Sequence, residues 1–237
     1  MPMPPRCSRP TPSWRLPSMP PCAARCARCS RRSRFRQGSR RCEKGLNMRI
    51  VAGEWRGQGL KQPPENITRP TTDRVREALF SAIESRIDLA GARVLDAFAG
   101  SGALGLEAVS RGAAHATFCE MNGKVLPVLK GNVAALAGAR GRCAVLRADV
   151  LKRPPVQEGP FDLVLLDPPY ALAADDVAAL VQALDEAGAL APEALVHYEH
   201  AKKDTAAAHA AFERIQWEAA VSKRYGDIAF DLFRRNR

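Results

Sequence analysis

The stretch VLDAFAGSGALGLEA, residues 94–108, is the most informative part of the sequence about its architecture. It reads as a short buried strand, a loop with the spacing Gly100-x-Gly102-x-x-Gly105, and the start of a helix. Glycines at this spacing permit a tight turn and let the backbone approach a ligand closely, while the amino terminus of the helix attracts negative charge. The stretch therefore predicts a Rossmann-like sheet that binds an adenosine-containing cofactor.

From Arg93 onward, short apolar runs alternate with helical segments rich in alanine and leucine. We expect strands near residues 93–98, 115–120, 143–147, 161–166 and 194–199, and helices near 103–112, 122–137, 174–188 and 204–212. The last two strand-like runs flank the turn at residues 225–227 and predict an antiparallel hairpin at the sheet edge. This alternation is typical of an α/β protein with a mostly parallel sheet and helices on both faces.

The part of the chain before the sheet predicts two smaller elements. Residues 49–61 suggest a short strand pair with glycines at its turns, and Thr72 is a suitable N-cap for a helix that ends near Ser85. A modest excess of arginines here fits either a solvated face or an anionic partner. We expect one domain over residues 48–237, made of this amino-terminal part (48–90) and the main sheet (91–237).

The positive charge of the chain is concentrated in its first 47 residues. The formal net charge is +11, and residues 1–47 combine many arginines with a single acid, Glu43. This extension has no apolar periodicity, so we expect it to be disordered or non-native, with the working protein beginning at Met48. An organellar transit peptide is the alternative. Its CAARCARC cysteines resemble iron–sulfur ligands in spacing, but prolines and arginines surround them, and we predict no metal site.

The sequence also predicts where the protein works. No apolar segment approaches the roughly 20 residues of a membrane span, and no secretory signal is visible. We therefore expect a cytoplasmic protein without a membrane partner, monomeric, in which Cys119 and Cys143 are reduced core residues.

Acidic residues at the ends of three predicted strands discriminate between cofactors. Glu120 ends the second strand, where a carboxylate can accept hydrogen bonds from both ribose hydroxyls of NAD or of S-adenosylmethionine. Asp96 lies directly before the glycine loop, where it would repel a pyrophosphate but suits the sulfonium and ammonium groups of S-adenosylmethionine. Asp149 follows the third strand and can accept the adenine amino group, or else serves as a turn residue. Together they favour S-adenosylmethionine.

The stretch FDLVLLDPPYA, residues 161–171, places chemistry at the end of the fourth strand. Proline cannot donate to a strand ladder, so the strand ends near Asp167, beside the glycine loop. The Asp167 carboxylate and the Pro168 carbonyl can accept both N–H bonds of an exocyclic amino group and aim its lone pair at a methyl donor. Tyr170 offers a face on which a flipped-out base can stack. This combination predicts a methyltransferase that acts on a nucleobase amino group.

DPPY and DAFAGSGALGLEA resemble the signature of amino-group methyltransferases with the class I Rossmann-like fold. MRIVAGEWRGQGL, RPTTDRVREALF, SRGA, YEH and RYGD narrow the resemblance to the bacterial small-subunit rRNA guanine-N2 methyltransferase family, over essentially all of residues 48–237. The resemblance implies a seven-stranded sheet with an antiparallel last strand. It also implies methylation of N2 of one guanine, guanine 966, of 16S rRNA, usually within an assembled small ribosomal subunit. Residues 1–47 have no counterpart in the family pattern.

The resemblance assigns roles to particular residues. It implies that S-adenosylmethionine is bound by Asp96, Gly100, Gly102, Glu120 and Asp149, together with Thr71 and Thr72. It implies an amino-group site made by Asp167, Pro168 and Tyr170. The RNA side would carry Arg56, Arg69, Arg74, Arg76, Arg224 and Tyr225. His197 and His200, which flank the YEH segment, are more simply read as structural or rim residues.

Three other functions remain open from the residues themselves. A DNA adenine or cytosine amino-methyltransferase uses the same chemistry, although about 190 residues leave little room for a target-recognition domain. A dinucleotide-dependent oxidoreductase shares the glycine loop, but Asp96 and the DPPY turn count against it. A non-enzymatic RNA-binding protein would depend on the basic extension 1–47, so deletion of that extension separates it from an enzyme.

Overall fold

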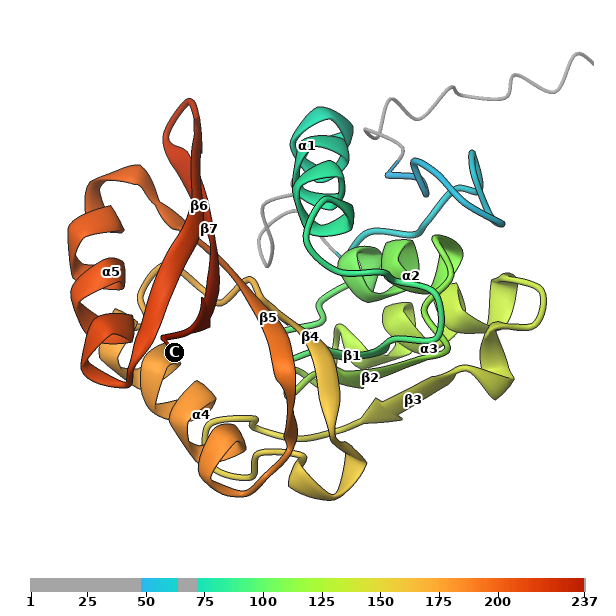
Figure 1. Ribbon diagram of the computed structural model, residues 1–237. Helices are drawn as coiled ribbons and strands as arrows, with labels where there is room; N and C mark the ends of the chain where they lie inside the picture. The colour runs from blue at the N-terminus through green and yellow to red at the C-terminus, as the bar shows by residue number, and fades with distance from the viewer. Residues whose placement is uncertain (1–47, 64–71, 237) are drawn as a thin grey trace, which may run out of the picture. The chain divides into compact units, whose positions relative to one another are not determined.

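The chain is built around one seven-stranded sheet (Figure 1). The computed structural model describes residues 48–63 and 72–236, which belong to one compact unit, Lys44–Arg237. The strands lie in the order β3-β2-β1-β4-β5-β7-β6. They are β1 (Arg93–Asp96), β2 (His115–Cys119), β3 (Cys143–Leu146), β4 (Phe161–Leu166), β5 (Leu190–Ala201), β6 (Trp217–Tyr225) and β7 (Ile228–Arg235). Strands β1 to β5 are parallel and β7 is antiparallel to both of its neighbours, so the predicted sheet is confirmed.

Helices cover both faces of the sheet (Figure 1). One face carries α1 (Asp73–Glu84), α2 (Ala103–Ser110) and α3 (Leu126–Ala135), and the other carries α4 (Ala174–Glu186) and α5 (Thr205–Arg214). Short 3₁₀ turns occur at Ala139–Gly141, Val156–Glu158 and Lys202–Asp204.

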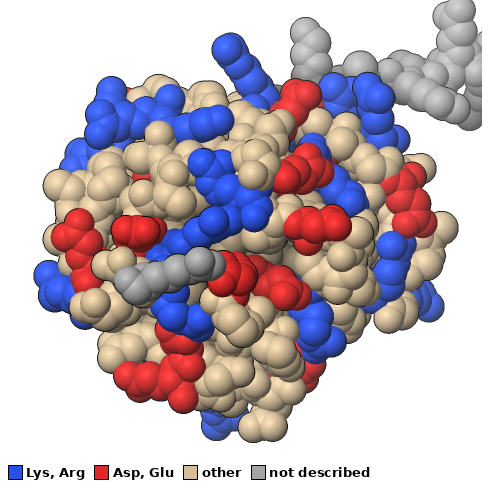
Figure 2. Space-filling view, in the orientation of Figure 1, with Lys and Arg blue, Asp and Glu red and all other residues tan. Residues whose placement is uncertain are grey.

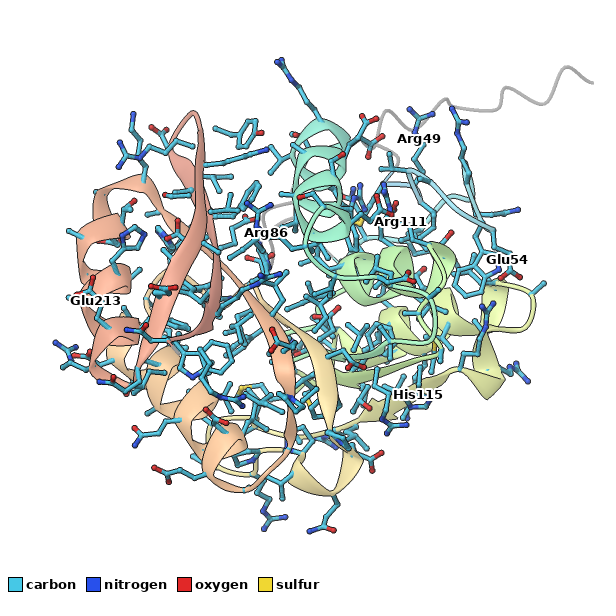
Figure 3. The ribbon with its side chains drawn as sticks, viewed as in Figure 1. Arg49, Glu54, Arg86, Arg111, His115 and Glu213 are labelled. Carbon is cyan, nitrogen blue, oxygen red and sulfur yellow. The ribbon has the colours of Figure 1, made fainter. Side chains whose placement is uncertain are left out.

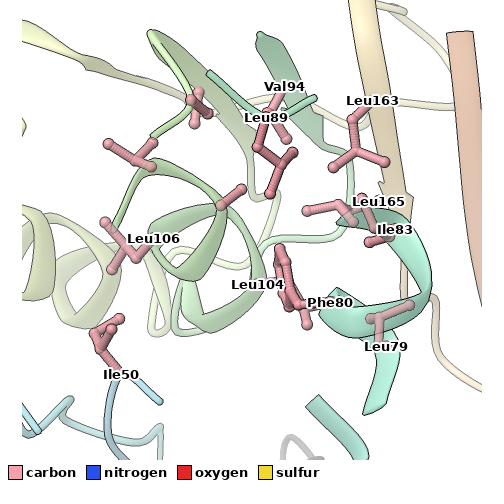
Figure 4. Packing of buried hydrophobic residues seen from close by; sticks show 14 of the residues in the cluster. Ile50, Leu79, Phe80, Ile83, Leu89, Val94, Leu104, Leu106, Leu163 and Leu165 are labelled. Atoms are coloured by element: carbon pink, nitrogen blue, oxygen red, sulfur yellow. The ribbon is translucent and has the colours of Figure 1, made fainter. Parts of the chain in front are cut away.

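The alternation of side chains along β4 divides the core into two layers. Leu163 and Leu165 pack with Phe80 and Ile83 of α1, and Figure 4 shows these four side chains facing one another. Val164 lies in the second cluster, under α4 and α5. Because both faces of the strand are buried, its apolar run is continuous, as in other parallel sheets.

Most of the predicted elements are confirmed within a few residues, and the differences have local causes. The helix expected from residue 122 begins at Leu126, because the Asn122 side chain accepts a hydrogen bond from the Lys124 amide (2.9 Å) and stabilises a turn. Thr72 caps α1 as predicted, with Oγ1 accepting from the Val75 amide at 3.4 Å. The strand pair expected over residues 49–61 is reduced to an isolated bridge between Arg49 and Gly59.

The amino-terminal extension and membrane-spanning segments were also subjects of prediction. The extension 1–47 lies outside the described residues. Within residues 48–63 and 72–236, no helix is long and apolar enough to cross a membrane.

Candidate functional site

The carboxyl ends of β1 and β4 lie side by side, and each ends in an acid. Asp96 of β1 pairs with Leu165 of β4, and the Ala97 amide donates to the Leu165 carbonyl at 3.0 Å. Asp96 is only 2% exposed, whereas Asp167, directly after β4, is partly exposed. The register therefore brings two carboxylates to the same edge of the sheet, as the sequence predicted.

The segment Gly100–Gly105 contacts the Asp96 side chain. The Asp96 carboxylate accepts a hydrogen bond from the Gly105 amide at 2.9 Å, in the first turn of α2. A side chain at Gly105 would lie 2.3 Å from the Phe118 ring, and Gly102 has the left-handed φ of +83° at the start of α2. Glycine is required at both positions, by packing at the first and by backbone conformation at the second.

Glu120 connects the glycine loop to the end of β2. One carboxylate oxygen accepts from the Gly100 amide at 2.9 Å, and the other accepts from the Asn122 amide at 2.7 Å. Each oxygen keeps a further lone pair, so the carboxylate is held in a fixed orientation and can still accept hydrogen bonds from a ligand.

The Asp149 carboxylate contacts residues that directly follow it in the chain. Its carboxylate accepts from the Leu151 amide at 3.2 Å and lies 3.4 Å from the Lys152 ammonium. Asp149 thus makes the turn that the sequence left open as an alternative, and its contact with adenine stays a prediction.

The pKa values of the two carboxyls at this edge are displaced in the same direction. Burial raises the pKa of Asp96 to about 7; the nearby carboxylates of Asp167 and Glu120 act in the same sense, and the Gly105 amide acts against them. Burial likewise raises the pKa of the Asp167 carboxyl to about 7. Each acid is held where its anion is poorly solvated, so the edge favours a cationic ligand.

The turn after β4 borders a cavity of about 510 Å³. Pro168, Pro169 and Tyr170 line it, together with residues at the end of β5, in the 3₁₀ turn that follows and in α5, among them Tyr198, His200 and Lys203. The Tyr170 side chain is 45% exposed. Among the described residues, no backbone amide donates to the Pro168 carbonyl. A planar group can therefore enter beside Tyr170 and Pro168.

A buried polar cluster around Asp231 includes His200, which lines this cavity at the end of β5. His200 lies 2.8 Å from the Asp231 carboxylate through Nε2 and 3.0 Å from the Ala201 carbonyl through Nδ1. Both partners are acceptors, so this geometry requires a proton on each ring nitrogen. His209 also approaches Asp231, at 3.1 Å. These contacts fit the structural reading of His200, while both ring nitrogens of the fully buried His197 have no hydrogen-bond partner within the described residues.

The residues predicted to meet RNA occupy different environments. Arg56, Arg74 and Arg224 are exposed, and Tyr225 is half-buried with its ring stacked on Phe230. Arg76 is only 1% exposed, and its guanidinium binds Asp73 at 2.7 Å, so it lies on the buried side of α1 rather than on the surface. Thr71 and Arg69 lie outside the described residues, and the exposed Thr72 uses its hydroxyl as a helix cap.

Basic residues gather on one part of the surface. Figure 2 shows blue side chains over the β6–β7 hairpin and between this hairpin and α1, with acidic side chains interspersed. Arg86 lies in the gap between these elements (Figure 3), where its Nη2 approaches the Ala220 carbonyl of β6 at 3.4 Å.

Residues that the sequence analysis missed hold the segment 48–63, here called the amino-terminal strap, against α2 and α3. Glu107 is fully buried and accepts from the amides of Val51 (2.7 Å) and Ala52 (2.9 Å). Arg111, also bound to Glu107, lies between the strap and α1 (Figure 3). Ser110 accepts from the Trp55 amide at 2.9 Å. A buried acid in the middle of a helix was the available signal.

Comparisons with known proteins agree with this architecture. A family model described as Conserved hypothetical protein 95 matches residues 48–234. Ribosomal RNA small subunit methyltransferase D of Escherichia coli K12 is 37% identical over 188 residues, which cover 79% of this chain and 90% of that protein. The protein of the same name from Haemophilus influenzae is 39% identical over 158 residues, 65% of this chain and 79% of its own length.

A solved structure shows the same arrangement of strands and helices. The methyltransferase-like protein yhhF from Escherichia coli superposes with a TM-score of 0.65 at 33% identity, over 80% of this chain and 98% of that chain. The fold is thus that of the Rossmann-like methyltransferases, and the chain belongs to the family of ribosomal RNA small subunit methyltransferase D.

Proposed function

We propose that the protein transfers a methyl group from S-adenosylmethionine to the exocyclic N2 of one guanine of 16S rRNA. The observation that carries this proposal is the pair of carboxylates, Asp96 and Asp167, at the adjoining ends of β1 and β4 beside the glycine loop. The relatives named as ribosomal RNA small subunit methyltransferases support the reaction and the kind of RNA. The choice of guanine N2, and of the position in the RNA, is our proposal.

The residues at the sheet edge fit S-adenosylmethionine. This donor supplies an electrophilic methyl group on a sulfonium when it is bound. Burial raises the pKa values of the Asp96 and Asp167 carboxyls, so the cationic sulfonium and ammonium groups of the donor would stabilise their ionised forms. Glu120, already oriented by the Gly100 and Asn122 amides, can accept the ribose hydroxyls. Gly100 and Gly102 let the backbone approach the donor closely.

The turn after β4 positions the amino group. The lone pair of an exocyclic amine is delocalised into its ring, so the amine is a weak nucleophile. The Asp167 carboxylate and the Pro168 carbonyl would accept its two N–H bonds and turn the lone pair toward the methyl donor. The two prolines keep these acceptors rigid, because their φ angles are fixed. The proton that is lost can pass to Asp167 or to water.

The cavity beside Tyr170 offers room for the flipped-out base. Its volume of about 510 Å³ exceeds what one base needs, and Tyr170 presents a partly exposed ring at its wall. The exposed Arg56, Arg74 and Arg224, with Tyr225, would contact the surrounding RNA, which we propose is presented in an assembled small subunit. Arg69, Thr71 and Thr72 keep their proposed roles, and we place the monomeric enzyme in the cytoplasm, where ribosomal subunits assemble.

The test offers the purified protein labelled S-adenosylmethionine with three substrates in parallel: unmodified small ribosomal subunits, naked 16S rRNA and duplex DNA. We expect N2-methylguanosine from a ribosomal substrate, identified by mass spectrometry of the nucleosides. Label in DNA adenine or cytosine would keep the chemistry but refute the substrate. The absence of label with a folded protein that binds S-adenosylmethionine would refute the proposed reaction.

A further inference from the structure

We infer that Asn132 of α3 is a positioning residue that fixes the glycine loop to the amino-terminal strap, and so sets the affinity for the methyl donor. This inference rests on the proposed function of the glycine loop. Asn132 is 2% exposed and does not itself touch the carboxylates of the site. It acts through the backbone of Ser101, the residue between Gly100 and Gly102.

Three hydrogen bonds exhaust most of the capacity of the Asn132 amide. Oδ1 accepts from the Lys61 amide at 2.8 Å, while Nδ2 donates to the Lys61 carbonyl at 2.9 Å and to the Ser101 carbonyl at 2.8 Å. The partners determine the orientation of the side chain, because only its nitrogen can donate to two carbonyls. One buried amide therefore joins a strap residue to the middle of the glycine loop.

A second contact holds the same loop residue to the strap. The Ser101 hydroxyl donates to the Met48 sulfur at 3.3 Å, and Ser101 is 7% exposed. Ser101 is thus held at its carbonyl by Asn132 and at its side chain by Met48. The backbone of the loop does little to fix its own conformation. Gly100 and Gly102 both have positive φ angles, which other residues rarely adopt, and glycine can also adopt many other conformations.

The position of the peptide at Ser101 matters for the cofactor. The Gly100 amide donates to the Glu120 carboxylate. Gly102 is the N-cap of α2, and in the first turn of that helix the Gly105 amide donates to Asp96. A shift of Ser101 would therefore move both carboxylate contacts that flank the donor site. Loss of the donated bonds also leaves the buried Ser101 carbonyl without the Asn132 donor, which is costly in an interior.

The substitution Asn132→Asp tests the inference, because it keeps the shape and the bond from Lys61 but removes both donated bonds. We expect the dissociation constant for S-adenosylmethionine, measured by calorimetry without RNA, to rise about tenfold or more. At saturating donor, kcat should change much less than the KM for the donor. Asn132→Ala gives the same comparison if the charged variant does not fold, since it places no carboxylate against the carbonyls.

Ser110→Ala is the matched control. It removes an anchor of the same strap, because the Ser110 hydroxyl accepts from the Trp55 amide and donates to the Ala52 carbonyl, and within the described part of the chain these bonds do not involve the glycine loop. We expect it to lower the melting temperature while the donor affinity stays within about twofold of wild type. Unchanged affinity in the Asn132 variant, or equal losses in both variants, would overturn the inference. A wild-type protein that does not bind S-adenosylmethionine would instead refute the proposed function on which it rests.

Discussion

Two groups of buried acids in this molecule have opposite surroundings. Glu107 is fully buried under the amino-terminal strap and accepts three hydrogen bonds, from Val51, Ala52 and Arg111. Asp96 is equally inaccessible, but it accepts one amide hydrogen bond and faces the acid Asp167. The first carboxylate is satisfied by the chain itself. The second is arranged so that its anion is stabilised by something the chain does not supply, which is what a site for a cationic ligand requires.

The largest effect that tests this contrast is on catalysis. Asp167→Ala removes an acceptor for the amino group, so we expect the rate of methyl transfer in single turnovers to fall by roughly 10²–10³ or more. The affinity for S-adenosylmethionine, measured by calorimetry, should change by only a few fold. Asp176→Ala, an exposed acid in the first turn of α4, is the control and should leave both quantities unchanged. A collapse of donor affinity in the Asp167 variant would show that this residue is misassigned.

The acid under the strap should affect stability rather than chemistry. Glu107→Ala leaves the amides of Val51 and Ala52 without this acceptor and removes one of the two carboxylates that pair with the 8% exposed Arg111, so we expect urea unfolding to report a loss of about 3–5 kcal/mol. Glu84 also pairs with Arg111, but it is 42% exposed, and Glu84→Gln should cost no more than about 1 kcal/mol. Losses of the same size in both variants would remove the distinction between the satisfied buried acid and an exposed one.

The dependence of stability on pH tests the surroundings of Asp96. Asp96 has a folded pKa of about 7, above its ordinary value of 3.8, so the folded state binds the proton more tightly than the unfolded state. Its contribution to stability is therefore greatest at low pH and is lost as the pH rises from about 4 to about 7. Three groups face the Asp96 carboxyl: the acids Asp167 and Glu120, which raise its pKa, and the Gly105 amide, which lowers it.

The measurement compares urea unfolding of wild type and Asp96→Asn between pH 5 and 8. Asparagine keeps an acceptor for Gly105 and cannot ionise, so the variant should gain on wild type by at least about 1 kcal/mol across this range. Saturating S-adenosylmethionine should reduce the difference, because a cation favours the ionised acid. A constant difference between the two proteins at every pH would show that Asp96 does not titrate there.

The sequence predicted the functional edge better than the anchors of the strap. Strand ends, glycines and prolines have local signals in the sequence, so these signals alone place Asp96, Glu120 and Asp167 at one edge of a sheet. For Glu107 the sequence offers only an acid within a helix, and nothing local indicates its partners or those of Asn132, because they lie 55, 56 and 71 residues away in the sequence, or 31 for the bond to Ser101. Arg76 shows the same limit: an arginine in a basic segment suggested an RNA contact, whereas packing of α1 buries it.

Substitution of Tyr170 by phenylalanine should have the smallest effect on activity. Unlike the buried acids, Tyr170 lies at the exposed wall of the cavity. Its ring is 45% exposed at the cavity wall, so its proposed role depends on the ring face and not on burial. Tyr170→Phe keeps the face and should change kcat/KM for the ribosomal substrate by less than about threefold. Tyr170→Ala removes it and should reduce kcat/KM by about tenfold or more, since stacking of a base on an aromatic ring contributes roughly 1–3 kcal/mol. An inactive phenylalanine variant would mean that the hydroxyl acts in the reaction, and the acceptors at Asp167 and Pro168 would then not be sufficient to orient the amino group.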